Sequence, residues 1–237
     1  MLTNSQTPVK THFTLKKLCN KIKRKKGTEH MSHAATHEGS SHVEDRNDPQ
    51  FGKASIGKIA MWIFLVTDAM SFSGFLLGYA VLRSTMNWPN PADHLGINLS
   101  GFATFILICS SVSMVLSIDA CKNKDRKGML NWLFATIAGG AFFLGIQVYE
   151  YYHLIHQGIT LASFAHGPSL FGSTFYIVTG FHGLHVLTGV IYLICEYRMA
   201  KRGDYDKGDY NRLEIAGLFW HFVDLVWILV FTFIYLL

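Results

Sequence analysis

The 237-residue chain is 50% hydrophobic and only 16% charged, and its apolar residues form long blocks instead of the spaced patterns of a soluble domain. Residues 1–55 contain ten Lys or Arg and five Asp or Glu, whereas residues 56–237 contain eleven of each kind. The composition therefore excludes a soluble globular enzyme, and the net charge of +5 belongs to an N-terminal arm and does not indicate nucleic-acid binding.

The arm, residues 1–55, is predicted to be a basic, histidine-bearing, disordered cytoplasmic segment. It contains no apolar block of the kind that a signal peptide requires. Three further interpretations stay open: the basic residues between Lys16 and Lys26 bind anionic lipid, translation begins at Met31, or the arm binds a metal weakly. The last would use His30, His33, His37 and His42.

Beyond the arm, residues 56–237 are predicted to form an all-α integral membrane domain. A helix needs about 20 residues to cross a hydrocarbon core of roughly 30 Å. Five blocks are long and apolar enough to do so, which predicts a bundle of five transmembrane helices. They are Ile56–Leu82, Leu99–Ile118, Met129–Ile155, Phe171–Tyr197 and Ala216–Leu237.

The connections between these blocks predict the orientation. Residues 119–128 and 198–215 are rich in Lys and Arg, whereas residues 83–98 contain only Arg83 and residues 156–170 contain neither Lys nor Arg. Basic connections stay in the cytoplasm. We therefore expect a cytoplasmic N-terminus and a C-terminus outside.

Three acidic residues, Asp68, Glu150 and Asp224, fall inside the predicted helices. A charge at the bilayer centre is costly, so each acid requires a neutral form, a hydrogen bond or a paired cation. Proton handling, a lipid or subunit contact, and a plain hydrogen bond between helices all remain possible at this point.

Two pairs of polar residues, each separated by three positions, lie near the middle of their helices. His182 and His185 share one face of the fourth helix, and His221 and Asp224 share one face of the fifth. Three imidazoles and a carboxylate at similar depth could bind a metal, although this spacing also arises when small polar clusters tie helices together.

The sequence lacks the motifs that are typical of several classes of enzyme. It has no phosphate-binding glycine loop, no G-x-S-x-G and no H-E-x-x-H, and its four cysteines form no C-x-x-C pair. The chain by itself is therefore not assigned a catalytic residue.

Four stretches resemble subunit III of haem–copper terminal oxidases. They are KIAMWIFLVTDAMSFSGFLLGY, FFLGIQVYEYYHLI, GSTFYIVTGFHGLHVLTGVIYL and LFWHFVDLVWILVFTFIYLL. The resemblance covers residues 51–237 and implies the five-helix form of this subunit. It also implies that the chain is non-catalytic and binds no haem or copper, and that these cofactors belong to partner subunits.

The resemblance also assigns candidate site residues. Asp68 occupies the position of an intramembrane acid of the family, and the other recurring polar positions are Glu150, His182, His185, Trp220, His221 and Asp224. These residues are expected to support proton uptake or to contact lipid or another subunit, and none is expected to bind metal. The two histidines of the fourth helix are then expected to form hydrogen bonds across the bundle.

In functional terms, the resemblance implies a subunit of an aerobic respiratory, proton-pumping cytochrome c oxidase in the bacterial plasma membrane. It would stabilise subunit I, hold phospholipid and support proton uptake, with subunit II, further oxidase subunits and a respiratory supercomplex as additional partners. Enzyme activity is implied only for the complex. Subunit III of a quinol oxidase is the close alternative, and a stand-alone proton channel or transporter is the alternative from another class.

Overall fold

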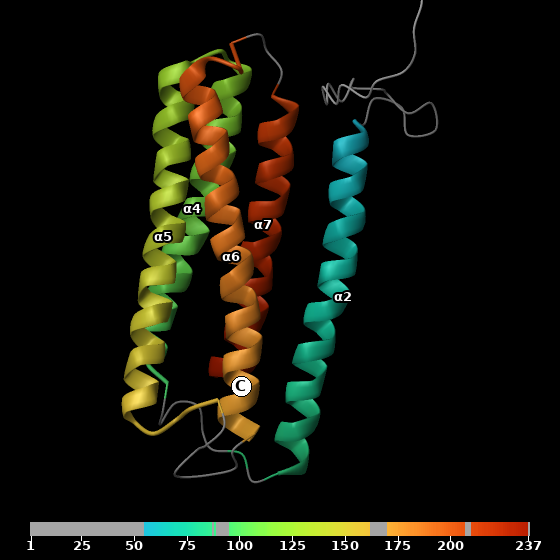
Figure 1. Cartoon of the computed structure of the whole chain (residues 1–237), viewed down its shortest axis with the longest axis vertical. Coiled ribbons are helices and arrows are strands. Elements are labelled where there is room, and N and C mark those ends of the chain that lie inside the picture. Colours follow the sequence, from blue (N-terminus) through green and yellow to red (C-terminus); the bar gives the residue numbers. More distant parts are fainter. Residues whose placement is uncertain (1–54, 87, 89–94, 162–169, 207–209, 237) are drawn as a thin grey trace, which may run out of the picture. The chain divides into compact units, whose positions relative to one another are not determined.

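The computed structural model describes residues 55–86, 88, 95–161, 170–206 and 210–236. In these ranges the chain is helical and contains no strand, and five helices are long and apolar enough to cross a membrane (Figure 1). They are α2 (Ile56–Thr85), α4 (Ile97–Lys122), α5 (Arg126–His156), α6 (Leu170–Arg202) and α7 (Asn211–Phe231), which continues as the π-helical turn η1 (Thr232–Leu236). The predicted all-α membrane fold is confirmed, and the predicted arm lies outside the described residues except for Ser55.

The helices are longer than the apolar blocks that predicted them. Helix α6 continues to Arg202 where the block ends at Tyr197, and α7 begins at Asn211 where the block begins at Ala216. Backbone hydrogen bonding of a helix does not stop at the edge of the hydrocarbon, so polar and basic residues extend each end. Hydropathy marks the membrane-embedded part of a helix and not its ends.

Side chains cap two of the helices at their N-termini. The hydroxyl of Ser55 accepts from the backbone N–H of Lys58 at 3.4 Å, and the carboxylate of Asp125 accepts from that of Gly128 at 3.1 Å. Each contact satisfies a backbone donor that the first helical turn leaves without a partner.

Three helices end in residues with left-handed backbone conformation. Gly158 follows α5 with φ 80°, Gly203 follows α6 with φ 93°, and Lys124 follows α4 with φ 60°. The backbone N–H of Asp125 then bonds back to Ala120 O at 2.9 Å, which closes a tight turn and makes α4 and α5 antiparallel neighbours.

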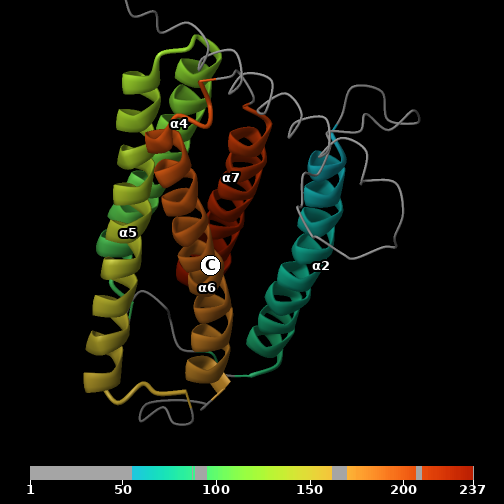
Figure 2. The ribbon, with the colours of Figure 1, turned by 45° about the horizontal axis from the view of Figure 1, so that its top comes forward.

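Helices α4 and α5 pack along each other, α6 packs on α5, and α7 packs on both α4 and α6 (Figures 1 and 2). Helix α2 packs on α7 and makes a smaller contact with α6. The four helices α4 to α7 therefore enclose the apolar core, and α2 lies at its side.

Trp220 of α7 fills the centre of this core and is fully buried. Its indole N–H donates to the hydroxyl of Ser110 on α4 at 3.2 Å. The ring lies against Gly140 of α5 and Gly189 of α6, where an added Cβ would lie 2.9 Å and 3.0 Å from Trp220 ring atoms. Glycine is required at these positions because the indole occupies the space of a side chain.

Candidate functional site

The predicted site residues do not form one site but four separate contacts inside the bundle. Asp68 pairs with His185, His182 packs among aromatic rings, His221 and Asp224 lie next to Ser111, and Glu150 joins two other helices. Trp220 belongs to the apolar core described above.

Asp68 and His185 connect α2 to α6. The Asp68 Oδ1 atom lies 3.3 Å from His185 Nε2, and the Asp68 carboxyl is only 8% exposed. His185 Nδ1 lies 2.8 Å from Phe181 O, and because a carbonyl only accepts, Nδ1 carries a hydrogen. A hydrogen bond between the two side chains then requires one more proton, either on the carboxyl or on Nε2. The pair is therefore suited to hold a single proton.

His182 lies one helical turn before His185 and points elsewhere. Its ring stacks on Trp227 with centroids 5.0 Å apart and meets Phe143 edge-on at 6.0 Å. The side chain is 1% exposed, and neither ring nitrogen has a hydrogen-bond partner among the described residues. The expected hydrogen bond across the bundle is thus confirmed for His185 and is wrong for His182, because aromatic rings occupy the space around it.

His221 and Asp224 share one face of α7, as their spacing predicts. The Ser111 hydroxyl of α4 lies 2.5 Å from His221 Nδ1 and close to the Asp224 carboxyl. Asp224 is buried, and neither carboxyl oxygen has a hydrogen-bond partner within the described ranges.

Glu150 of α5 joins α4 to the C-terminal turn. Its carboxyl accepts from the Ser100 hydroxyl at 2.9 Å and from the Tyr235 hydroxyl at 2.8 Å, and all three groups are buried. The arrangement ties η1 to α4 and α5, and it satisfies both carboxyl oxygens without a cation.

The histidines and acids do not converge into a metal site. Among the described residues, no three His, Cys, Asp or Glu side chains lie close enough together to hold a metal ion. His182 faces Trp227 while His185 faces Asp68, so two of the imidazoles that the spacing grouped together have different neighbours. The spacing of these residues along α6 and α7 therefore does not bring three donors together in the described part of the chain.

Helix α6 contains a further buried acid, Glu196, which was not among the three acids predicted inside the helices. This residue lies near the end of α6, is buried, and accepts a hydrogen bond from the hydroxyl of Tyr205, which follows the helix. Burial and the neighbouring Glu196 raise the pKa of Tyr205. The signal was present, because Glu196 falls within the predicted Phe171–Tyr197 block.

Charged residues at the same end of the bundle also make contacts that the sequence did not predict. Glu214 of α7 pairs with Lys58 of α2 and, at 2.8 Å, with Lys122 of α4. Ser55 donates from its hydroxyl to the Asn211 side chain at 2.9 Å. These contacts hold α2 to α7 at this end.

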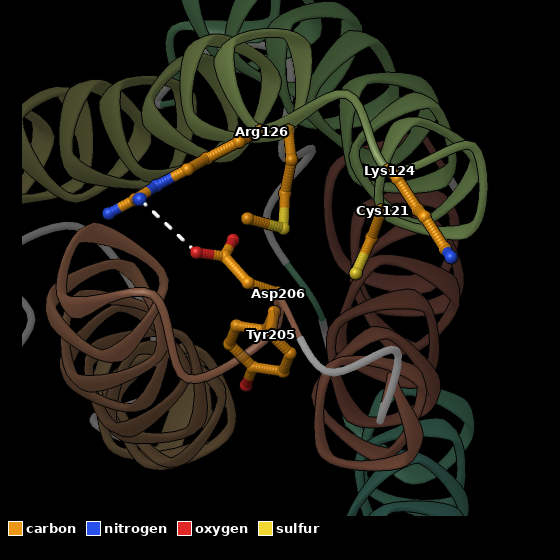
Figure 3. A pocket seen from close by; sticks show the side chains of 6 residues that line it. Cys121, Lys124, Arg126, Tyr205 and Asp206 are labelled. Carbon is orange, nitrogen blue, oxygen red and sulfur yellow. Dashed lines mark hydrogen bonds and ion pairs between the residues drawn. The ribbon is translucent and has the colours of Figure 1, made fainter.

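A pocket of about 200 Å³ lies beside the α4–α5 turn (Figure 3). Arg126 and Asp206 point toward each other across it, with 3.3 Å between Nη1 and Oδ2, and the Arg126 Nη2 donates to Lys201 O at 2.5 Å. The Arg126 guanidinium thus already has two partners within the chain. These contacts connect the start of α5 to the end of α6 and the segment that follows it. Its lining residues are Cys121, Lys124, Arg126, Met129, Tyr205 and Asp206.

These observations define a class: an all-helical, multi-pass membrane protein whose core contains paired acids and histidines but, in its described part, no gathered metal ligands. The comparisons specify the family. The family model for cytochrome c oxidase subunit III matches residues 53–237, which is most of the chain. The chain therefore belongs to the cytochrome c oxidase subunit III family.

Individual relatives agree with this assignment. A cytochrome c oxidase subunit 3 of a Synechocystis species is 38% identical over 189 residues, covering 78% of each chain. A probable cytochrome c oxidase subunit 3 of Nocardia farcinica is 36% identical over 195 residues, covering 81% of this chain and 91% of the relative. A quinol oxidase subunit 3 of Bacillus spizizenii is 30% identical over 210 residues, covering 88% of this chain and 97% of the relative. A subunit of this family has partner subunits, and the redox centres of the oxidase lie in those other subunits.

Proposed function

We propose that this chain is the non-catalytic subunit III of an aerobic respiratory, proton-pumping cytochrome c oxidase. It stabilises subunit I, holds phospholipid and supports proton uptake, while the haem and copper of partner subunits carry electrons to O₂. The family match along all five helices carries this proposal. Subunit I is the main partner, and subunit II, further oxidase subunits and a respiratory supercomplex are the others.

The proposed setting is the bacterial plasma membrane, with the N-terminus in the cytoplasm and the C-terminus outside. The distribution of Lys and Arg supports this orientation, because the basic connections 119–128 and 198–215 lie on one side of the bundle. Residues 1–55 form a cytoplasmic arm and residues 56–237 form the subunit III domain in this proposal.

Stabilisation is the principal role, and the contacts between helices support it. Asp68 and His185, Glu150 and Tyr235, and Ser111 and His221 each join different helices. Such contacts keep the surface that meets subunit I in one arrangement. Trp220 and Asp224 lie on the buried face of α7 and contribute to the same packing.

Support of proton uptake is the second role, and it belongs to Asp68 and His185. With Nδ1 of His185 donating to Phe181 O, the contact between Nε2 and Asp68 holds a single proton that either side chain can carry. While the pair holds this proton its net charge is zero, because the proton lies either on the carboxyl or on Nε2, where the imidazolium neutralises the carboxylate. Release of the proton leaves one negative charge on Asp68, and this charge favours uptake of the next proton.

Co-purification tests the proposal. The chain is tagged at its C-terminus and isolated in mild detergent, and a reduced-minus-oxidised visible spectrum is recorded. We expect oxidase haem in near-equal proportion to the chain, and electron transfer from cytochrome c in the same sample. An intact, lipid-containing preparation without haem would contradict the proposal.

Two alternatives give different results in this experiment. Turnover with quinol but not with cytochrome c would indicate a quinol oxidase, which the Bacillus spizizenii relative makes a specific candidate. Proton conduction by the isolated chain in liposomes, without haem, would indicate a stand-alone channel or transporter.

A further inference from the structure

The surface between α4 and α7 presents a polar atom within an apolar region. His221 of α7 is half-buried, and its Nδ1 atom lies 2.5 Å from the Ser111 hydroxyl of α4. The other ring nitrogen, Nε2, forms no hydrogen bond with another described residue and is not one of the buried atoms that lack a partner. Nε2 is therefore at the surface of the bundle, where a molecule outside this chain can contact it.

This nitrogen lies inside the hydrocarbon core of the membrane. Its neighbour Ser111 is seven residues from Ile118, where the predicted apolar block of α4 ends, and a rise of 1.5 Å per residue makes this about 10 Å. Water and lipid headgroups stay outside the hydrocarbon core, and acyl chains have no group that forms a hydrogen bond. Neither lipid nor water therefore provides a partner for Nε2 at this depth.

Apolar side chains surround His221 at this surface. Leu225 and Ile228 follow His221 by four and seven residues on the same side of α7, and Ile108 and Val115 lie about one turn on either side of the serine on α4. All four are exposed, by 42% to 57%. We call these four residues together with His221 the α4–α7 face. A helix packed on this face would meet apolar side chains around one central polar group.

Electrical neutrality places a hydrogen on Nε2. Asp224 is buried beside the same Ser111 hydroxyl, so a net charge on these side chains would be costly inside the hydrocarbon. If the Asp224 carboxyl is neutral, the Ser111 hydroxyl donates to Nδ1, and the neutral imidazole carries its hydrogen on Nε2. If the carboxyl is ionised, neutrality requires an imidazolium, which has hydrogens on both nitrogens. Nε2 is a donor in either case and requires an acceptor.

We propose that the α4–α7 face binds a transmembrane helix of a partner subunit, and that the His221 Nε2–H donates to a side-chain oxygen of this helix. The oxygen lies at the level of Ser111 and belongs to a hydroxyl, amide or carboxyl group, because these groups accept from an imidazole N–H. The inference rests on the proposed function, since a partner helix requires a complex of subunits. It deepens that function by specifying a docking surface and the chemistry that recognises it.

Two substitutions separate the two nitrogens of His221. His221→Asn places an amide where Nδ1 stands, so the contact with Ser111 is kept and the outward donor is lost. His221→Gln places its amide near the position of Nε2, so the outward donor is kept and the contact with Ser111 is lost. His153→Asn is the matched control, because His153 is exposed near the end of α5 and bonds to Gln157 of its own helix at 2.9 Å.

The first measurement is the fraction of the chain released from the purified oxidase during a detergent titration. A polar contact between membrane helices is modest, so we expect His221→Asn to weaken retention by about 3- to 30-fold. His221→Gln and His153→Asn should match the parent chain. Unchanged retention of His221→Asn would overturn the proposal. Release of His221→Gln to the same extent or more would also overturn it, because the contact with Ser111 would then account for the effect.

The second measurement identifies the molecule on the α4–α7 face. Benzoylphenylalanine replaces Leu225 in the assembled oxidase, the complex is irradiated, and the cross-linked product is identified by mass spectrometry. We expect a transmembrane peptide of another subunit, with a hydroxyl, amide or carboxyl side chain near the cross-link. Cross-links to lipid alone, or to a second copy of this chain, would overturn the proposal.

The haem content of the same preparations separates this inference from the proposed function. If the parent preparation lacks haem and position 225 still cross-links to a transmembrane helix of another subunit, the proposed function fails and the docking surface stands. If haem is present and the cross-link reaches only lipid, the proposed function stands and the docking surface is wrong.

Discussion

Asp68 is a buried acid to which two roles are proposed, stabilisation of the bundle and support of proton uptake. Its contact with His185 is a direct side-chain link between α2 and α6 near mid-depth, and loss of the carboxyl would leave the His185 Nε2 atom facing apolar rings such as Phe72. A polar contact between membrane helices is worth about 1–2 kcal/mol in favourable cases.

The first prediction separates the two roles of Asp68. Asp68→Ala should destabilise the subunit by about 1–2 kcal/mol, because the contact between helices is lost, and the oxidase should inactivate faster during turnover. Asp68→Asn should restore most of the lifetime, since an amide can still bond to His185, but it cannot exchange the proton. Lifetime and turnover are measured across pH for both variants.

Ser71→Ala is the control for this prediction, because Ser71 is exposed on the same helix and its hydroxyl donates to the backbone carbonyl of Thr67 at 3.2 Å. If turnover of Asp68→Asn falls at high pH, the pair supplies protons. If both variants match the parent chain in lifetime and pH profile, neither role is correct.

At the scale of the helices, packing around Trp220 explains why α5 and α6 carry glycine in their interiors. Glycine is normally unfavourable within a helix by about 1 kcal/mol relative to alanine. Gly140 and Gly189 are required here because the indole of Trp220 lies against the backbone of both helices. The packing of α5 and α6 against the Trp220 side chain of α7 therefore compensates for the low helix propensity of the two glycines.

The second prediction concerns Gly140→Ala. The added methyl group would lie 2.8 Å from Val190 Cγ2 and 2.9 Å from Trp220 Cζ2, so α5 must move away from α6 and α7. Overpacking of this kind costs typically 1–3 kcal/mol. The temperature at which the subunit dissociates from the purified complex should fall.

Gly145→Ala provides the comparison, because its methyl group meets nothing within 4 Å on the same helix. We expect no loss of stability in this variant. Equal dissociation temperatures for Gly140→Ala and Gly145→Ala would show that Trp220 does not pack as described.

At the scale of the whole helical domain, α2 is attached differently from the other four helices. Its interior contacts combine apolar packing on α7, the Asp68–His185 pair, and the ionic contacts at the Glu214 end. Much of its remaining surface is apolar and exposed, including Ile63, Met70 and Leu77. Lipid and partner subunits are expected to cover this surface.

The third prediction follows from the position of Glu214 between Lys58 and Lys122. Glu214→Gln removes the shared counter-charge, and because the pairs are partly exposed the cost should be only about 0.2–1 kcal/mol. The effect should disappear in roughly 1 M salt, where charges are screened within about 3 Å. Subunit dissociation is measured by heating the complex at low and high salt.

Asp119→Asn is the control, because Asp119 is an exposed acid at the same end of the domain whose side chain bonds to Asn123 at 3.2 Å. It should behave like the parent chain at both salt concentrations. A loss in Glu214→Gln that persists at high salt would indicate that Glu214 acts through packing and not through charge.

The sequence by itself determined the membrane class, the five helices and the family. These properties depend on local features of the sequence. The length of an apolar block predicts whether a helix can cross the bilayer, and a family motif such as T-G-F-H-G-L-H-V lies within one helix. It also identified Asp68, Glu150 and Asp224 as unusual, because an acid in an apolar block is costly wherever its partner lies.

Only the tertiary structure decided which groups meet. Asp68 pairs with His185 and not with His182, and Glu150 meets Ser100 and Tyr235 from two other parts of the chain. The spacing places two residues on one face of a helix, but a helix that is apolar on all sides does not reveal which neighbour that face contacts. The partners were therefore hidden until packing fixed the rotation of each helix against the next.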